Sequence, residues 1–138
     1  IYSLRDWGHA KDYVEMQWKI LQFKTPDDFV ISTGKQYSVK FFVEQCCKFL
    51  GIIIKWKGRG VNEVGYIYNL NKLKNPKLKK GMIIIRIDKK YFRPLDVDNL
   101  IGDSRKAQRL LNWKPKTTIY DLISRMMKSD LNSIKKNL

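Results

Sequence analysis

Leu4-Arg5-Asp6-Trp7-Gly8-His9-Ala10-Lys11-Asp12-Tyr13-Val14 is the stretch around which the chain is organised, because it gathers an arginine, two aspartates, a glycine and two aromatic residues. A second run, Tyr91-Phe92-Arg93-Pro94-Leu95-Asp96-Val97-Asp98, has the same make-up: an arginine beside an aromatic residue, with a carboxylate three residues later. A planar guanidinium pairs bidentately with phosphate or carboxylate. We interpret the runs as halves of one anion-binding site, in which Arg5 and Arg93 clamp a diphosphate and Asp96 accepts hydrogen bonds from ribose hydroxyls.

Each arginine also has a purely structural interpretation, as an ion pair with the neighbouring Asp6 or Asp98. For either arginine alone this interpretation is slightly favoured, and the shared pattern tips the balance weakly towards a binding site. No paired nucleophile and base is visible in the sequence. The residues by themselves therefore indicate an anion-binding α/β piece and no catalytic centre.

Composition describes one globular domain with a large positive charge. The 138 residues are 43% hydrophobic and 12% aromatic, enough to bury a core. No apolar run approaches the roughly 20 residues of a membrane span. Lysine and arginine number 28 against 13 acids, a net charge of +15, which suggests nucleic acid or an acidic surface as a partner. Most of the excess is scattered lysine and only residues 72–80 form a dense block, so we favour solvated surfaces over a dedicated binding face.

The ends and the cysteines suggest the cellular context. The chain opens with neither a methionine nor a signal-peptide pattern, so we expect a piece of a longer protein. Cys46 and Cys47 are adjacent within an apolar helical pattern, which predicts buried free thiols in a reducing cytoplasm. His9 is the single histidine, and without a spaced cluster of cysteine and histidine we expect no zinc site.

Periodicity predicts an α/β fold with the order α-β-α-β-β-β-α-α. We expect Asp12 to cap the first helix, with Val14, Trp18 and Leu21 on one of its faces. The first helix covers residues 12–22, and the next expected helix covers residues 38–50, capped by Ser38 and stopped by Gly51. A short third helix is capped by Asp103, with Ala107, Leu110 and Leu111 inward. The last covers residues 118–136 and carries one apolar stripe: Ile119, Leu122, Ile123, Met126, Met127 and Leu131. The expected strands cover residues 29–33, 52–57, 66–68 and 82–88.

Two motifs resemble the catalytic or cofactor-binding motifs of dinucleotide-dependent enzymes only superficially. Tyr68 and Lys72 have the spacing that places a catalytic tyrosine beside a lysine on one face of a helix, but a loop of Lys, Asn and Pro follows them. Gly58-Arg59-Gly60 lacks the third glycine at the position that a dinucleotide-binding turn needs. We interpret both as coincidences.

Five collinear motifs closely resemble the C-terminal part of the GDP-mannose 4,6-dehydratase family, within the extended short-chain dehydrogenase/reductase superfamily. They are Ser3-Leu4-Arg5-Asp6-Trp7-Gly8-His9-Ala10-Lys11-Asp12-Tyr13-Val14, Asp28-Phe29-Val30-Ile31-Ser32-Thr33-Gly34, Tyr91-Phe92-Arg93-Pro94, Leu100-Ile101-Gly102-Asp103 and Leu111-Asn112-Trp113-Lys114-Pro115. The resemblance implies the GDP-sugar-binding portion of such an enzyme over residues 1–138, lacking most of the Rossmann domain. It also implies that residues 12–34 return a helix and a strand to that nucleotide-binding domain. Because this helix packs back into that domain in the family, we expect its apolar face to be exposed in this chain.

The resemblance implies a cytoplasmic lyase that converts GDP-mannose to GDP-4-keto-6-deoxymannose with tightly held NADP, on the route to GDP-fucose and related deoxysugars. In the family the two motif arginines contact GDP and an acid three residues after the second holds the ribose; carried over, these are Arg5, Arg93 and Asp96. The family usually has glutamate at the last position, so Asp96 is one methylene shorter.

The resemblance places the catalytic and NADP-binding residues before Ile1, so this chain alone is expected to be inactive. It also implies a homo-oligomer in the intact enzyme, with no membrane and no nucleic acid as partners. The alternative class is a standalone basic module that binds nucleic acid or an acidic partner, which would show a steep dependence of affinity on salt.

Overall fold

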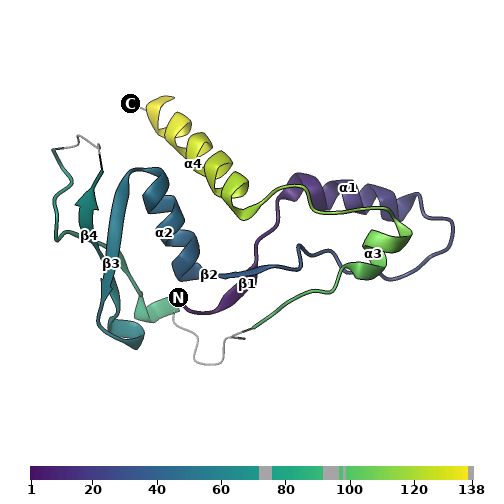
Figure 1. Ribbon diagram of the computed structural model, residues 1–138, viewed down its shortest axis with the longest axis horizontal. Helices are drawn as coiled ribbons and strands as arrows, with labels where there is room; N and C mark the ends of the chain where they lie inside the picture. The colour runs from purple at the N-terminus through teal and green to yellow at the C-terminus, as the bar shows by residue number, and fades with distance from the viewer. Residues whose placement is uncertain (72–75, 92–96, 98, 137–138) are drawn as a thin grey trace. The chain divides into compact units, whose positions relative to one another are not determined.

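A computed structural model describes residues 1–71, 76–91, 97 and 99–136 (Figure 1). The chain forms two compact units. The first unit is Ile1–Phe41 with Val97–Leu138, and the second is Phe42–Asp96. The first contains β1 (Leu4–Asp6), α1 (Ala10–Leu21), β2 (Gln36–Ser38), α3 (Arg105–Leu110) and α4 (Ile119–Lys136). The second contains β3 (Ile52–Lys57), η1 (Gly60–Asn62), β4 (Val64–Leu70), β5 (Ile83–Arg86) and η2 (Lys89–Tyr91). The boundary falls within α2 (Val39–Phe49), and the mixed content confirms the α/β class.

The start of α1 corrects one expectation. The N-cap is His9, whose Nδ1 accepts a hydrogen bond from the Lys11 amide at 3.0 Å, so the helix begins two residues before the predicted cap Asp12. Asp12 lies inside the first turn and is buried. Histidine is an uncommon N-cap residue and aspartate a common one, so the sequence favoured Asp12 over His9.

The His9 cap leads to a stability prediction. We expect His9→Ala to lower the free energy of unfolding by about 1 kcal/mol, because the Lys11 amide loses its acceptor. His9→Asn supplies a side-chain oxygen in place of the Nδ1 acceptor and should restore most of that loss. Urea unfolding followed by circular dichroism measures both variants, and equal stability of the alanine and asparagine variants would contradict the capping role.

The apolar face predicted for α1 is present but turned outward. Val14, Trp18 and Leu21 are 60%, 61% and 80% exposed. The buried side of the helix centres on Met16, with Tyr13 and Ile20 packed against the same core. The apolar stripe predicted for one face of this helix is therefore present, and it is exposed.

Residues 29–33 were expected to form a strand and do not. Ser32 and Thr33 are held through other contacts: the Ser32 hydroxyl donates to the Gly102 carbonyl at 2.8 Å, and Thr33 binds Asp6. The two-stranded sheet of this unit comes instead from β1 and β2, antiparallel, with Arg5 opposite Tyr37. Three-residue strands are too short to produce a recognisable alternation in the sequence.

The core of the first unit forms around Trp113. The buried cluster is Met16, Ala107, Leu111 and Trp113, and Tyr13, Ile20, Phe23, Phe29 and Ile31 pack against it. Ala107 and Leu111 face inward as predicted, whereas Leu110 is exposed, because the six residues of α3 bury only a narrow side. The Asp103 carboxylate accepts a hydrogen bond from the Arg105 amide at 3.0 Å, although the backbone assigns Ser104 as the cap.

A reciprocal capping arrangement starts α4. The Asp121 amide donates to the Thr118 hydroxyl at 3.2 Å, and the Thr118 amide donates to the Asp121 carboxylate at 3.3 Å. Ile119, Leu122 and Ile123 are buried at the beginning of the helix, while Met126 further along is exposed. Met127 and Leu131 are half-buried, so the predicted stripe continues along the helix, and Met126 is its exposed member.

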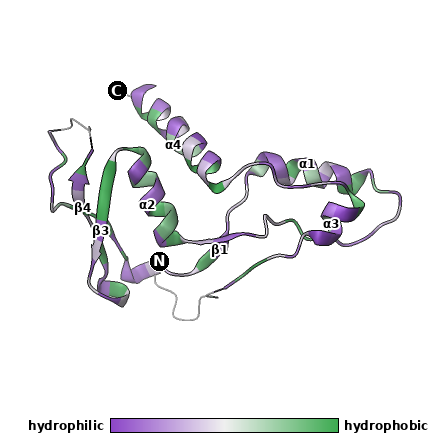
Figure 2. Ribbon diagram, viewed as in Figure 1, coloured by the Kyte–Doolittle hydropathy of each residue, from purple (hydrophilic) through white to green (hydrophobic). Residues whose placement is uncertain are grey.

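The second unit packs the end of α2 against an antiparallel sheet of order β3-β4-β5. Its core is Cys47, Ile52 and Ile67, and Figure 2 shows the apolar start of β3 in green. The prediction for residues 52–57 is confirmed, β4 is longer than the predicted 66–68, and β5 is shorter than 82–88. Both cysteines are free, but Cys46 is only half-buried; burial raises the pKa of the Cys47 thiol, with Cys46 and Glu44 adding to the effect.

Candidate functional site

Arg5 lies in β1, and its guanidinium bridges two main-chain carbonyls. Nη1 donates to the Leu4 carbonyl at 2.8 Å and to the Val97 carbonyl at 2.7 Å. Val97 belongs to the second predicted run and directly follows Asp96, so Arg5 contacts that run through a main-chain carbonyl. Arg93, Asp96 and the alternative partner Asp98 lie outside the described residues. The structure thus positions one of the predicted site residues and the immediate sequence neighbour of another.

Asp6, the alternative partner of Arg5, holds the loop that leads into β2. Its carboxylate accepts hydrogen bonds from the Thr33 amide at 2.9 Å, the Thr33 hydroxyl at 2.6 Å and the Gly34 amide at 2.9 Å. Gly34 has φ 71°, a backbone conformation that favours glycine. Three donors on one carboxylate fix the turn at residues 33–34 against β1, and with it the strand that carries Arg5.

Trp7 and Gly8 shape the connection from β1 to α1. The Trp7 indole N–H donates to the Tyr37 carbonyl at 3.2 Å, which ties this connection to β2. Gly8 carries no side chain because the Tyr13 phenol lies over it, and a Cβ at this position would overlap the phenol. Burial, reinforced by the charges of Asp6 and Asp12, raises the pKa of Tyr13. These contacts fix the backbone between Arg5 in β1 and the start of α1.

Asp12 joins the first motif to the fifth. The side chain is 5% exposed, and its Oδ2 accepts hydrogen bonds from the Lys116 amide at 3.0 Å and the Thr117 amide at 2.8 Å. The Trp113 indole N–H donates to the Asp12 carbonyl at 3.0 Å. Burial by itself would raise the pKa of Asp12, but the hydrogen bonds from Thr117 and Lys116 outweigh it and lower that pKa below its usual value.

A small cavity of about 110 Å³ lies beside Trp7, lined also by Thr33, Lys35 and Tyr37 and by residues 115–119. Ligand pockets usually measure roughly 300 to 1,000 Å³, so this cavity is too small to hold a nucleotide. This cavity by itself therefore does not identify a nucleotide site among the described residues.

The two motifs that resemble dinucleotide-enzyme motifs do not have the backbone geometry that those motifs need. Gly58 and Gly60 have φ 93° and 55° and lead into η1, three residues long, and not into an α-helix whose amides face a pyrophosphate. Tyr68 lies in β4, where residues four apart do not share a helical face, and Lys72 lies outside the described residues. Both resemblances to dinucleotide chemistry are coincidental, as interpreted from the sequence.

The sequence interpretation missed the contacts that hold the site together. Thr33 and Gly34 bind Asp6 from 27 and 28 residues away, and the Val97 carbonyl binds Arg5 from 92 residues away. Thr33-Gly34 belongs to a motif that carries the family resemblance, which was the available signal. A main-chain carbonyl gives no signal, because every residue has one.

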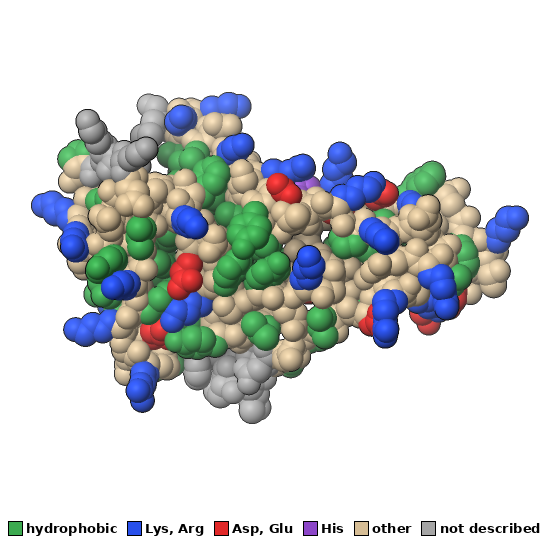
Figure 3. All heavy atoms as spheres, viewed as in Figure 1, with side chains coloured by type: hydrophobic (Ala, Val, Ile, Leu, Met, Phe, Trp, Pro, Cys, Tyr) green, Lys and Arg blue, Asp and Glu red, His purple; other side chains and the backbone are tan. Residues whose placement is uncertain are grey.

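The basic side chains of the described residues do not form a continuous patch on the face of the molecule shown in Figure 3. Figure 3 shows lysine and arginine side chains scattered over the visible face, interspersed with acids and apolar side chains. Among the helices of the described chain, none combines the length and apolar character needed to cross a membrane.

Comparison with known proteins identifies the family. The family model described as GDP-mannose 4,6 dehydratase matches residues 1–126. The GDP-mannose 4,6-dehydratase of Vibrio cholerae is 47% identical over 129 residues, which are 94% of this chain and 35% of that protein. The Drosophila melanogaster protein of the same name is 49% identical over 135 residues (98% and 32%), and the Homo sapiens protein is 43% identical over 133 residues (96% and 33%). The chain spans about a third of the length of these relatives, and it belongs to the GDP-mannose 4,6-dehydratase family.

Proposed function

We propose that the protein containing this chain converts GDP-mannose to GDP-4-keto-6-deoxymannose, for the synthesis of GDP-fucose and related deoxysugars. In this proposal the chain supplies the residues that hold the GDP moiety: Arg5, Arg93 and Asp96. The observation that carries the assignment is the 2.7 Å hydrogen bond from Arg5 to the Val97 carbonyl, because it brings the first arginine motif to the chain beside Asp96. Membership of the family supports the reaction.

The proposed roles follow from the shapes of the side chains. A guanidinium presents a fixed fork of donors to two phosphate oxygens, and two such forks neutralise a diphosphate. Asp96 accepts hydrogen bonds from the ribose hydroxyls. Because aspartate is one methylene shorter than the usual glutamate, the ribose must lie closer to the backbone here.

The remaining chemistry is assigned to the part of the protein that this chain does not cover. NADP supplies the hydride acceptor for that chemistry, and we place its binding turn, together with the acid and base of the elimination, in the other two-thirds of the relatives' length. The chain alone is therefore expected to bind substrate without turning it over. The intact enzyme is proposed to be a cytoplasmic homo-oligomer.

The exposed stripe of α1 supports the proposed division of domains. Val14, Trp18 and Leu21 form an apolar surface that a soluble domain rarely leaves open. Residues 29–33 have the composition of a strand without pairing in a ladder. We propose that residues 12–34 complete the nucleotide-binding domain of the intact enzyme, with this stripe buried against it.

Binding of GDP-mannose to the 138-residue chain tests the proposal. We expect Arg5→Ala and Arg93→Ala each to weaken binding by about 1.5 to 3 kcal/mol, because each variant removes charged hydrogen bonds to phosphate. Arg109→Ala, a matched control on the exposed side of α3, should change the affinity little. Arg5→Lys keeps the charge and can still donate to Val97, so a large loss in that variant would identify the bidentate geometry as essential.

The main alternative outcome is a polyanion-binding module. Residues 42–96 contain 13 lysines and arginines against 4 acids, a net charge of +9. A basic module would bind a DNA duplex more tightly than GDP-mannose and lose that affinity steeply with salt. Selective GDP-mannose binding that depends on Arg5 and Arg93 supports the dehydratase assignment. Binding of the duplex without binding of GDP-mannose would favour the polyanion-binding module instead.

A further inference from the structure

The second unit has a free strand edge at β3. The sheet order is β3-β4-β5, so among the described residues β3 has β4 on one side and no strand on the other. Ile54 lies opposite Ile67 of β4. The amide of Ile67 donates to the Met82 carbonyl at 2.8 Å, and the carbonyl of Ile67 accepts from the Gly81 amide at 2.7 Å. The main chain of Ile67 therefore faces residues 81–82, which lead directly into β5. Because hydrogen-bonding direction alternates along an antiparallel ladder, the N–H and C=O of Ile54 point away from β4.

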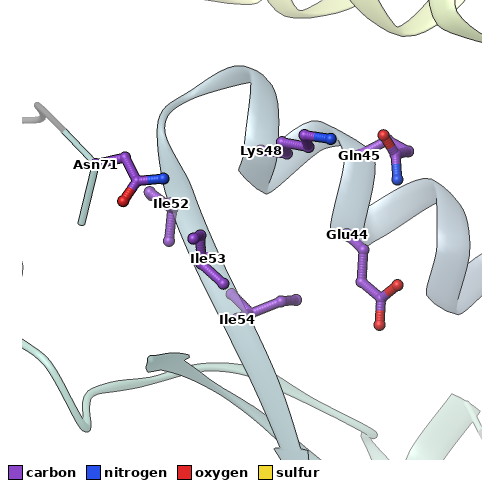
Figure 4. A pocket seen from close by; sticks show the side chains of 7 residues that line it. All are labelled: Glu44, Gln45, Lys48, Ile52, Ile53, Ile54 and Asn71. Atoms are coloured by element: carbon purple, nitrogen blue, oxygen red, sulfur yellow. The ribbon is translucent and has the colours of Figure 1, made fainter. Parts of the chain in front are cut away.

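A groove runs beside this edge. It measures about 330 Å³ and lies between β3, at Ile52–Ile54, and the α2 residues Glu44, Gln45 and Lys48 (Figure 4). The isoleucines give the groove an apolar wall, and Ile53 is 38% exposed. The Glu44 carboxylate is held at the opposite wall by the Trp56 indole N–H at 2.7 Å. An apolar side chain entering from the β3 edge would lie against isoleucine.

The charges around the edge discriminate between partners. Lys55 and Lys57 are exposed on the outer face of β3, and Lys48 is exposed at the groove. Together with the net charge of +9 in this unit, these lysines oppose pairing with a second copy of the chain. The same charges favour a strand that carries acidic residues.

We propose that the free edge of β3 accepts an extended acidic peptide segment of a partner protein as an added β-strand. The main-chain groups of Ile54 pair with the incoming strand, as in other complexes formed by strand addition. Side chains alternate along a strand, so branched apolar residues enter the groove beside Ile54 and acidic residues lie near Lys57 on the outer face. The incoming segment is thus expected to alternate acidic and branched apolar residues. Its binding site at the β3 edge uses none of the residues proposed to hold the nucleotide.

Titration of the 138-residue chain with a labelled peptide of alternating aspartate and valine tests the proposal. We expect saturable binding at low salt, and much weaker binding of a peptide of alternating lysine and valine. Lys57→Glu should weaken binding of the acidic peptide by about tenfold, because it replaces an attraction by a repulsion. Lys128→Glu makes the same change in net charge on α4 and should have less than about a twofold effect.

Hydrogen exchange at the Ile54 amide separates strand addition from general electrostatic attraction. This amide should exchange rapidly in the free chain and slow at least about tenfold in the presence of the acidic peptide, while the amide of Lys55, which faces β4, should change little. Equal binding of both peptides, equal effects of the two glutamate variants, or an Ile54 amide unaffected by peptide would overturn the proposal. So would a concentration-dependent dimer that protects the Ile54 amide without peptide.

Discussion

Replacing Trp113 with alanine is expected to lower the free energy of unfolding of the first unit by about 3 to 5 kcal/mol. The side chain is 1% exposed and fills the centre of the cluster formed with Met16, Ala107 and Leu111. Its removal leaves a large cavity and also deprives the Asp12 carbonyl of the indole N–H at 3.0 Å. Urea unfolding monitored by circular dichroism measures the change.

Trp113→Phe separates the two contributions. Phenylalanine keeps much of the apolar volume but has no N–H, so the loss should fall to about 1 to 2 kcal/mol. The exposed Trp18 provides a matched control, since Trp18→Ala removes the same side chain from a surface position and should cost much less. Similar losses for the Trp113→Ala and Trp18→Ala variants would show that the cluster is not the core of the unit.

Asp12→Ala is expected to destabilise the chain by about 2 to 4 kcal/mol, because it leaves the amides of Lys116 and Thr117 without their acceptor. Asp12→Asn retains an oxygen that can accept from one of them and should cost less. The exposed Asp130 on α4 gives a control, and Asp130→Ala should be nearly neutral. The same denaturation experiment compares the three variants.

The lowered pKa of Asp12 adds a dependence on pH. A carboxylate with a lower pKa in the folded than in the unfolded state stabilises the fold fully above the unfolded value of about 3.9, and this contribution disappears as the pH falls through the folded value. The wild-type chain should therefore lose stability from about pH 5 downward more steeply than Asp12→Asn. Parallel stability profiles for the two proteins would show that Asp12 does not titrate in the expected way.

The elements predicted well from the sequence were those whose signal is local. Residues 52–57 alternate and are rich in isoleucine, Ser38 accepts a hydrogen bond from the Phe41 amide at 3.0 Å, and Thr118 starts α4. Residues 29–33 have equally strong strand composition, but a strand needs a partner, and strand composition does not reveal whether one is present. The exposed stripe of α1 has the same cause: periodicity identifies an apolar face without showing what covers it.

The candidate site was predictable in its residue types and not in its contacts. Arg5 stands out because an arginine beside carboxylates and aromatic residues is a recognisable combination. Asp12 was assigned to the cap because an acid near a helix start usually binds local amides; here its partners lie 104 and 105 residues away, which only the tertiary fold determines. The family resemblance supplied the roles of Arg93 and Asp96, which spacing alone would not have given.

The link between Asp12 and the segment from Trp113 to Thr117 restricts how this part of the protein can evolve. Each end of the chain carries one half of a shared set of donors and acceptors. In each bond one partner is a main-chain group, so loss of the Asp12 carboxylate or of the Trp113 indole leaves an amide or a carbonyl that a substitution in the opposite segment does not remove. We therefore expect the identities of Asp12 and Trp113 to be restricted, and those of Lys116 and Thr117, which contribute only their amides, to vary more freely.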